Sequence, residues 1–378
     1  MKLLIVNWHD WTHPQAGGAE IHLREIVARW SAWGHEVTLL CAGEGGKPRE
    51  VHLLGARVLR AGHRKTFNWI LPAAYRRLSR ESFDLVIEDV NKIPLYLPLF
   101  AGRPVLGLVH HLFGTVAFLE TNPVVASYVW LGERALPAAY RRTPLVAVSN
   151  STREDLIDRG LPPENIEVVY GGIPLPPAGL DGRRAPWPSF VYLGRVKRYK
   201  HIELALQAFA RILPEIPRAR FTIAGYGDHG EGLEREAARL GIERQVSFQG
   251  RVDETEKWRL LASSWALLYT SPKEGWGLSS LEAQAAGTPV VASDSPGLRE
   301  TVVPGRTGFL VPHGDVHALA ERMRELAASP ELVERLGAEG RAHAARFAWD
   351  ASARRLLDVC ERRLRWRRLE EDLAHASA

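Results

Sequence analysis

The hydrophobic positions along this chain repeat one pattern: a short apolar run, a loop that contains glycine, and an amphipathic segment. Residues 3–7 form a mainly apolar run, Gly17 and Gly18 lie in the loop that follows, and apolar residues recur at helical spacing over 19–33. A second apolar run covers 36–41. A strand, a glycine loop, a helix and a strand in this order predict a βαβ unit with parallel strands.

The same pattern continues through the chain. It predicts further strands over 51–59, 85–88, 104–109, 145–148, 166–170, 190–193, 220–224, 245–249 and 266–269. Helices are expected over 66–80, 201–213, 256–263, 315–328, 330–347 and 349–374, and residues 117–139 predict one long helix or a helical hairpin. Ser151-x-x-Glu154 reads as a capping box that opens a helix ending near Arg159.

Proline and glycine concentrate between residues 171 and 188, which is typical of a linker between domains. The sequence therefore predicts an α/β protein with two Rossmann-like parallel-sheet domains. The expected bounds are an N-terminal domain over 1–172, a linker over 173–188 and a second domain over 189–346. A C-terminal helix over 347–378 is expected to pack back toward the N-terminal domain or, in part, to touch a membrane.

Composition narrows the classes of protein. A length of 378 residues favours two domains, and 46% apolar with 25% charged residues is ordinary for a soluble protein. Cys41 and Cys360 are far apart and form no metal-type pair, which favours a cytoplasmic setting. The first apolar run is too short for a signal peptide, and no run of about 20 apolar residues predicts a membrane span.

The charge pattern favours anionic partners. The net charge of +5 suits a phosphate-bearing ligand or an anionic membrane surface, and no basic run interleaved with aromatics suggests nucleic acid. Residues 66–80 mix Trp69 with several arginines, which suits a helix lying on anionic lipid. A solvated basic face over a packed stripe explains the same pattern, and a peripheral position on the inner membrane face stays a prediction.

Residues 271–291 concentrate the candidate chemistry. Glu274 and Glu282 stand eight residues apart, and Gly275 and Gly277 follow the first of them. We expect a strand end, a glycine loop and a helix that starts near Leu278. Loop amides and the positive end of the helix dipole suit a diphosphate, while the two carboxylates could accept hydrogen bonds from sugar hydroxyls.

Other loops after predicted strands carry further candidates. Arg195 and Lys200 suit phosphate oxygens, although exposed loop charges are the common alternative. Gly17 and Gly18 either let backbone approach a ligand or form a tight turn only. His110 ends a predicted strand, where α/β proteins place chemistry, but a single histidine is more often structural.

The segment Gly225-Tyr226-Gly227-Asp228-His229-Gly230 matches G-x-G-x-x-G literally. It is a weak dinucleotide fingerprint, because the next strand does not end in an acidic residue and the motif is not in the first unit of its domain. We interpret it as a turn that lines a nucleotide cleft, with Gly225 facing the ligand. Arg251 and Val252 follow the next strand, where a base could lie against backbone.

Taken together, these motifs resemble the retaining glycosyltransferases of family four, which have the GT-B fold and an E-x7-E signature. The resemblance covers nearly the whole chain and rests on motifs in the family's order: Gly17-Gly18-Ala19-Glu20, Gly34-His35-Glu36-Val37, His110, Gly194-Arg195 with Lys200, Gly225-x-Gly227, Glu274-Gly275-Trp276-Gly277-Leu278, Glu282-Ala283, Gly287-Thr288-Pro289-Val290-Val291 and Gly308-Phe309-Leu310-Val311.

The resemblance implies a role for each matching residue. Arg195 and Lys200 would neutralise the donor diphosphate, assisted by the amides of Gly275, Trp276, Gly277 and Leu278. Glu282 would hold the ribose and Glu274 the transferred sugar, which His110 would help to position. Gly17 and Gly18 would approach the phosphate or the acceptor. The GT-B fold would place the donor site in a cleft between the two domains. The resemblance implies that the N-terminal domain over 1–172 binds the acceptor and the C-terminal domain over 189–346 binds the nucleotide sugar.

The function implied is retaining transfer of a hexose from a UDP- or GDP-linked sugar to a glycan, lipid-linked or small-molecule acceptor. No cofactor and no essential metal are expected, since no D-x-D cluster occurs. His9, Asp10 and His13 could suggest a metal site, but we interpret them as lining the acceptor cleft. The alternatives are a sugar-nucleotide epimerase of the same fold and a non-catalytic nucleotide-sugar-binding protein.

The sequence departs from the family's pattern at three places. Trp276 stands where phenylalanine is usual. Gly171-Gly172-Ile173-Pro174 replaces the common Asn-Gly-Ile-Asp, so a donor contact from that segment is not expected to carry over. His111 directly follows His110, and His110 is chosen by its spacing from Pro104.

Overall fold

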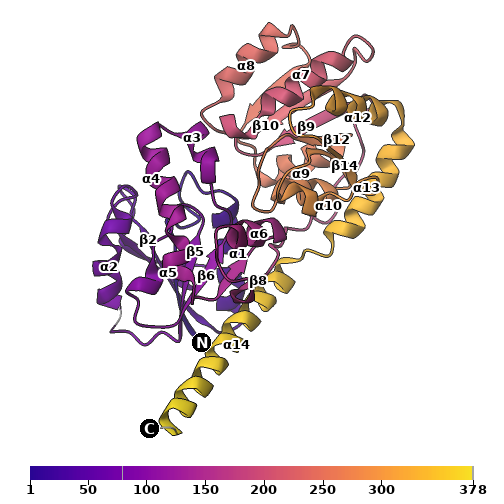
Figure 1. Ribbon diagram of the computed structural model, residues 1–378. Helices are drawn as coiled ribbons and strands as arrows, with labels where there is room; N and C mark the ends of the chain where they lie inside the picture. Colours follow the sequence, from indigo (N-terminus) through magenta and orange to yellow (C-terminus); the bar gives the residue numbers. More distant parts are fainter. Residues whose placement is uncertain (79, 377–378) are drawn as a thin grey trace. The chain divides into compact units, whose positions relative to one another are not determined.

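The computed structural model describes residues 1–78 and 80–376, with side chains as far as Trp366. The chain divides into two compact units. The first comprises residues 1–117, 122–172 and 349–378, and the second comprises residues 118–121 and 173–348. Each unit holds one β-sheet with helices packed against it (Figure 1).

The first unit is built on an eight-stranded sheet with the order β3-β4-β2-β1-β5-β6-β7-β8. All neighbouring strands are parallel except β3, which pairs antiparallel with β4. The strands are β1 (Lys2–Val6), β2 (Glu36–Ala42), β3 (Glu50–Leu53), β4 (Ala56–Ala61), β5 (Leu85–Val90), β6 (Val105–Val109), β7 (Leu145–Ala147) and β8 (Ile166–Val168).

The helices of this unit include α1 (Gly18–Ala32) and α2 (Phe67–Leu78). The others are α4 (Pro123–Arg134), α5 (Leu136–Tyr140), α6 (Asn150–Asp158) and α14 (Trp349–Ala376). The long helix α14 is the yellow helix that reaches the C-terminus in Figure 1. It packs on α1, where the Trp30 indole donates to the Ala353 carbonyl over 3.0 Å.

The second unit has a six-stranded, fully parallel sheet with the order β11-β10-β9-β12-β13-β14. Its core is apolar and aromatic; the Phe209 ring contacts both Phe190 and Phe221. The strands are β9 (Ser189–Leu193), β10 (Arg220–Ala224), β11 (Val246–Gly250), β12 (Ala266–Tyr269), β13 (Val290–Ser293) and β14 (Gly308–Val311).

The helices of the second unit follow its strands in alternation, as βαβ connectivity requires. They are α7 (Ile202–Ile212), α8 (Gly230–Arg239), α9 (Glu254–Ser263), α10 (Leu278–Ala285), α11 (Leu298–Thr301), α12 (Val316–Ala328) and α13 (Pro330–Ala344), while α3 (Ala117–Glu120) lies at the boundary of the two units. The prediction of an α/β protein with two parallel sheets is confirmed.

Three local predictions were wrong. The strand expected over 51–59 is a hairpin of β3 and β4, because Leu54 and Gly55 adopt left-handed backbone conformations that turn the chain. The capping box at Ser151 does not form: Ser149 is the N-cap of α6, and its hydroxyl accepts from the Thr152 amide.

The third correction concerns residues 117–139, which form three short helices rather than one long helix or a hairpin. Pro123 and Pro137 lie in the first turns of α4 and α5. A proline is tolerated there because it has no amide hydrogen to donate, but it cannot continue a preceding helix. Each proline therefore starts a new helix.

Candidate functional site

The loops at the carboxyl ends of β9, β10, β11 and β12 lie next to one another in the second unit, since these strands are neighbours in the sheet. Parallel α/β sheets place their ligand sites at this edge. Arg195 and Lys200 lie in the loop after β9, Gly225 after β10, and Arg251 with Val252 after β11. The Glu274 loop follows β12. One edge of this unit thus carries all the predicted donor-site residues except Gly17 and Gly18.

Lys200 and Glu274 form a nearly buried ion pair, with Lys200 only 5% exposed. Burial lowers the pKa of the lysine, but the Glu274 carboxylate and the Tyr199 hydroxyl together raise it, and the net shift is upward. Its ammonium group also lies 4.8 Å from the Tyr199 ring centroid. The structure therefore holds a charged lysine in place, and a diphosphate approaching this edge would meet a fixed cation.

Arg195 is held by the same small group of side chains. Its guanidinium donates to the Tyr199 hydroxyl over 3.1 Å, and its backbone carbonyl accepts from the Tyr192 hydroxyl over 2.8 Å. Burial first, and the Glu274 carboxylate second, raise the pKa of Tyr192 well above its ordinary value, so this hydroxyl stays protonated as a donor. The aromatic hydroxyls thus fix the loop that carries both cations.

The helix α10 begins directly after the glycine loop. Gly277 is its N-cap, with a φ of 91° that a side chain would strain. Among the described residues, none accepts a backbone hydrogen bond from the amides of Leu278 and Ser279 at the start of the helix. Free amides at a helix N-terminus can bind anions, and phosphate binding by this loop stays a prediction.

Glu282 lies one turn inside α10 and has a partner that the sequence did not indicate. Lys257, on α9, donates to its carboxylate over 2.8 Å. Burial raises the pKa of Glu282, and the Lys257 ammonium opposes that shift. Lys257 follows no motif, and only the packing of α9 beside α10 brings it to the site.

The glycines after β10 are required by close packing of backbone. A Cβ on Gly225 would lie 1.7 Å from the Gly194 carbonyl oxygen, and one on Gly227 would lie 1.8 Å from that of Val196. The loops after β9 and β10 are therefore in direct contact. Arg251 lies over the Tyr226 ring, 3.6 Å from its centroid, which gives a flat surface beside these loops.

Trp276 does not face solvent. It is buried, and its ring contacts Phe347 edge-on at a centroid distance of 5.3 Å. Its side chain therefore serves the packing of the second unit.

His110, Gly17 and Gly18 belong to the first unit, whereas the candidate residues after β9, β10, β11 and β12 belong to the second. His110 directly follows β6, and its Nε2 lies 3.0 Å from Oδ1 of Asp89 at the end of β5. Gly17 caps α1, and its amide donates to the Glu20 carboxylate, which is the half of a capping box that does not need an N-cap side chain. The ring of His111 contacts that of Phe113.

His9, Asp10 and His13 follow β1 but do not form a metal site. Asp10 pairs with Arg60 over 2.8 Å, and the rings of His9 and His13 stack at 3.8 Å. Over residues 1–78 and 80–376, no group of three or more histidine, cysteine or acidic side chains could hold a metal ion.

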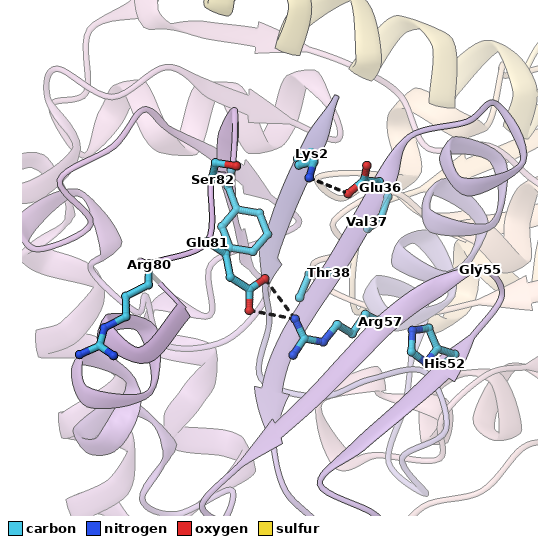
Figure 2. Close-up of a pocket in the computed structure, with 11 residues that line it drawn as sticks. Lys2, Glu36, Val37, Thr38, His52, Gly55, Arg57, Arg80, Glu81 and Ser82 are labelled. Carbon is cyan, nitrogen blue, oxygen red and sulfur yellow. Dashed lines mark hydrogen bonds and ion pairs between the residues drawn. The ribbon is translucent and has the colours of Figure 1, made fainter.

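A pocket of about 580 Å³ opens at the other edge of the first sheet. It lies at the amino ends of β1 and β2 (Figure 2). It contains two ion pairs, Lys2 with Glu36 at 3.2 Å and Arg57 with Glu81 at 2.9 Å. Since ligand sites of parallel sheets lie at the carboxyl edge, we do not place chemistry in this pocket.

Comparison with known proteins gives the family. A model described as Glycosyltransferase Family 4 matches residues 16–175, and one described as Glycosyl transferases group 1 matches residues 185–343. The chain belongs to glycosyltransferase family 4. Each of the two matches lies almost wholly within one structural unit.

Relatives of this family-4 protein include the D-inositol 3-phosphate glycosyltransferase of Streptomyces scabiei, 37% identical over 52% of the chain. That match covers 48% of the relative, so the chain spans about half its length. A glycogen synthase of Mycobacterium tuberculosis is 28% identical over 93% of the chain and 92% of the relative.

Solved structures confirm the GT-B fold. The sucrose-phosphate synthase of Thermosynechococcus elongatus superposes with a TM-score of 0.77 at 22% identity, covering 98% of this chain and 99% of the other. HepE of Anabaena, solved with UDP-glucose, gives a TM-score of 0.74 at 18% identity over 96% of this chain and 99% of the other. Within the described part of the family-4 protein, no helix is long and apolar enough to cross a bilayer.

Proposed function

We propose that this protein is a retaining glycosyltransferase that moves a hexose from a nucleoside diphosphate sugar to a hydroxyl-bearing acceptor. The observation that supports it best is the buried Lys200–Glu274 pair beside the free amides that open α10. A fixed cation and a helix N-terminus suit a diphosphate leaving group, and the adjacent carboxylate suits a sugar hydroxyl. The family's E-x7-E residues occupy this edge.

In the proposed reaction the bond between the anomeric carbon and the diphosphate oxygen breaks, and the acceptor oxygen forms the new bond on the same face. The acceptor proton leaves with the diphosphate. Lys200, Arg195 and the α10 amides would stabilise the negative charge that develops on the leaving group. Neither a cofactor nor an essential metal ion is proposed.

UDP-sugars are the first donors to test, because HepE was solved with UDP and UDP-glucose; GDP-sugars are the alternative. The relatives' names include an inositol phosphate and glycogen. We therefore propose a glycan, lipid-linked or small-molecule acceptor.

The test combines binding with turnover. A nucleotide at 100 times its Kd should stabilise the protein by about 2.7 kcal/mol, so thermal shifts with UDP, GDP, ADP and their sugars identify the donor. Product analysis by NMR then reports the anomeric configuration. Inverted product would refute retention, turnover without acceptor would support an epimerase, and binding without any turnover would indicate a binding protein.

Two substitutions test the residue roles. Lys200→Ala should weaken both nucleotide binding and transfer, whereas Lys197→Ala removes an exposed lysine of the same loop that pairs with Asp228 and should change little. Glu274→Ala should lower transfer far more than binding of the free nucleotide, since the nucleotide lacks the sugar. Equal losses of transfer and of nucleotide binding would show that Glu274 does not contact the transferred sugar. Activity is expected to survive a chelator.

We also propose that the first unit contacts an anionic membrane surface. The outward side of α4 is apolar, and Val124 is 80% exposed. Asn68 on α2 donates to Tyr128 on α4, which places the two helices side by side, and Trp69 on α2 is 75% exposed. Exposed arginines at 76 and 77 end α2. Exposed apolar and aromatic residues flanked by arginine suit an anionic bilayer interface.

Flotation with vesicles tests this surface. The protein should bind vesicles of equal parts phosphatidylcholine and phosphatidylglycerol, bind phosphatidylcholine alone weakly, and lose binding as salt rises. Val124→Ser with Leu131→Ser should abolish binding. The control Leu175→Ser changes a similarly exposed leucine of the second unit and should leave binding unchanged. Unchanged flotation of the double variant would reject α4 as the contact.

A further inference from the structure

Buried polar atoms without hydrogen-bond partners concentrate in one place in the described part of the chain. Most of them belong to residues at the carboxyl ends of β1, β5 and β6 and on helix α1: His9, His22, Asp89, Asn91 and His110. The other residues of the first unit with such atoms are Ser31, Glu44 and Trp349. Unsatisfied buried groups cost stability, so their gathering at one edge of the sheet needs a functional reason.

Asp89 is the most costly member of this group. It is fully buried, and its neighbour Glu88 provides a direct comparison. Consecutive strand residues point to opposite faces of the sheet. Glu88 accepts from the amides of Leu95 and Leu97 and from the Tyr140 hydroxyl, so its carboxylate is satisfied by the surrounding structure. Asp89 has no such partners.

Among the described side chains, His110 is the one that forms a recorded ion pair with the Asp89 carboxylate, while Glu20 and Lys92 act on it electrostatically. Nε2 of His110 lies 3.0 Å from Oδ1, within reach of a hydrogen bond but not yet aligned as one. Burial raises the pKa of Asp89, and His110 opposes that shift. Functional hydrogen bonds are often poorly aligned before substrate binds, and they tighten in the complex. Nε2 of His110 is therefore the nitrogen that can donate a hydrogen bond to the Asp89 carboxylate, and Nδ1 of the same ring is directed away from it.

His22 fixes the ring from a second side. Its imidazole lies edge-to-face with that of His110 at a centroid distance of 5.0 Å, and it stacks on Trp349 at 5.4 Å. Burial, and then His110, keep the pKa of His22 well below its ordinary value, so His22 is neutral. Among these contacts, Asp89 supplies the charge and His22 with Trp349 supplies the packing.

We propose that Asp89 is a positioning residue for His110: its carboxylate holds the proton on Nε2 and leaves Nδ1 as the nitrogen that meets the sugar. His22 and Trp349 limit rotation of the ring. This inference rests on the proposed function and on the family resemblance, which gives His110 its place beside the transferred sugar. The tautomer itself is a property of the free protein and can be measured without turnover.

Two-dimensional ¹H–¹⁵N NMR of the histidine rings in the full chain tests the tautomer, with His110→Gln used for assignment. The wild-type ring should carry its proton on Nε2. Asp89→Asn can donate through its amide and should move the proton to Nδ1, whereas Glu88→Gln, the buried carboxylate next to it, should leave the tautomer unchanged. A wild-type ring protonated on Nδ1 would overturn the proposal without any variant.

Kinetics supply the second readout. Asp89→Asn should lower kcat by roughly 10- to 100-fold, as found where a carboxylate that orients a metal-bound histidine is removed, while the donor KM changes little. Asp89→Glu should recover part of the loss. Glu88→Gln should lower Tm without this selective loss of kcat. If Asp89→Asn and Glu88→Gln both lose kcat in proportion to stability, Asp89 has a structural role only. If the tautomer behaves as expected but no transfer occurs, the proposed function fails, while the positioning of the His110 ring by Asp89 stands.

Discussion

Lys257 Nζ lies 2.8 Å from Oε1 of Glu282 and 2.7 Å from Oε2 of Glu254, so one ammonium group serves two carboxylates. The pair with Glu282 is shielded from solvent, while Glu254 is exposed. Burial lowers the pKa of Lys257, but the Glu282 and Glu254 carboxylates together raise it, and the net shift is upward. Lys257 in turn opposes the rise in the pKa of Glu282 that burial causes, which favours the ionised carboxylate that would accept ribose hydroxyls in the proposed donor site.

Replacing Lys257 with alanine should weaken nucleotide binding by about tenfold. The Glu282 carboxylate would lose its buried partner, and breaking such a pair leaves a costly unpaired charge. Glu282 would then take up a proton more readily, so binding should reach half its maximum at a higher pH than in the wild type. Isothermal titration with the preferred nucleotide at several pH values measures both effects.

The matched control for this variant is Arg259→Ala on the same helix. Arg259 is exposed and pairs with Glu256, so its loss should leave nucleotide affinity within twofold. If Lys257→Ala binds nucleotide as the wild type does at every pH, Lys257 does not support the donor site.

Gly227→Ala should destabilise the protein strongly. The new Cβ would lie 1.8 Å from the Val196 carbonyl oxygen, so the loop that carries Arg195 must move. Overpacking of this kind costs about 1–3 kcal/mol or more. Gly230→Ala is the control, because nothing lies within 4 Å of its Cβ at the start of α8. Urea unfolding should separate the two variants, and equal midpoints would show that the loops tolerate a side chain.

The alternation of apolar runs and glycine loops was sufficient to predict both parallel sheets, because buried strands and amphipathic helices differ in period. It failed where a single turn decided the outcome, as at Leu54 and Gly55, which split one apolar run into β3 and β4. The motif residues of the second unit gather at one sheet edge because they all follow adjacent strands. Lys257 and Asp89 could not be found in this way, since only packing between elements gives them their partners.

The stability of the first unit should fall as pH drops below about 6.5. Burial, with smaller effects of nearby cations such as Lys92, lowers the pKa of His9 to about 3. Above pH 6.5 this histidine is neutral in both the folded and the unfolded chain, so it has no effect on the pH dependence. Below that pH the unfolded chain takes up a proton that the folded protein refuses until pH 3, so stability is lost over this window.

His9 should lower the free energy of unfolding by about 1 kcal/mol between pH 7 and pH 5.5. His22, whose pKa is also far below its ordinary value, should lower it by a similar amount. Urea unfolding at fixed pH values measures the slope. His9→Phe should make the slope shallower, while the exposed His52→Phe should not. A slope that is identical in all three proteins would contradict the assignment.

Trp349→Ala should both destabilise the first unit and disturb the histidines at its sheet edge. Trp349 is buried at the start of α14, stacks on His22, and leaves so little room that a Cβ on Gly172 would lie 2.5 Å from its Cα. Removing a buried tryptophan costs about 3–5 kcal/mol. Trp366→Ala, on the exposed side of the same helix, should change stability by at most about 0.5 kcal/mol. Because His22 packs on His110, Trp349→Ala should also shift the His110 ring signals in NMR, and Trp366→Ala should not. Similar unfolding free energies for the two variants would mean that Trp349 does not support this edge of the sheet.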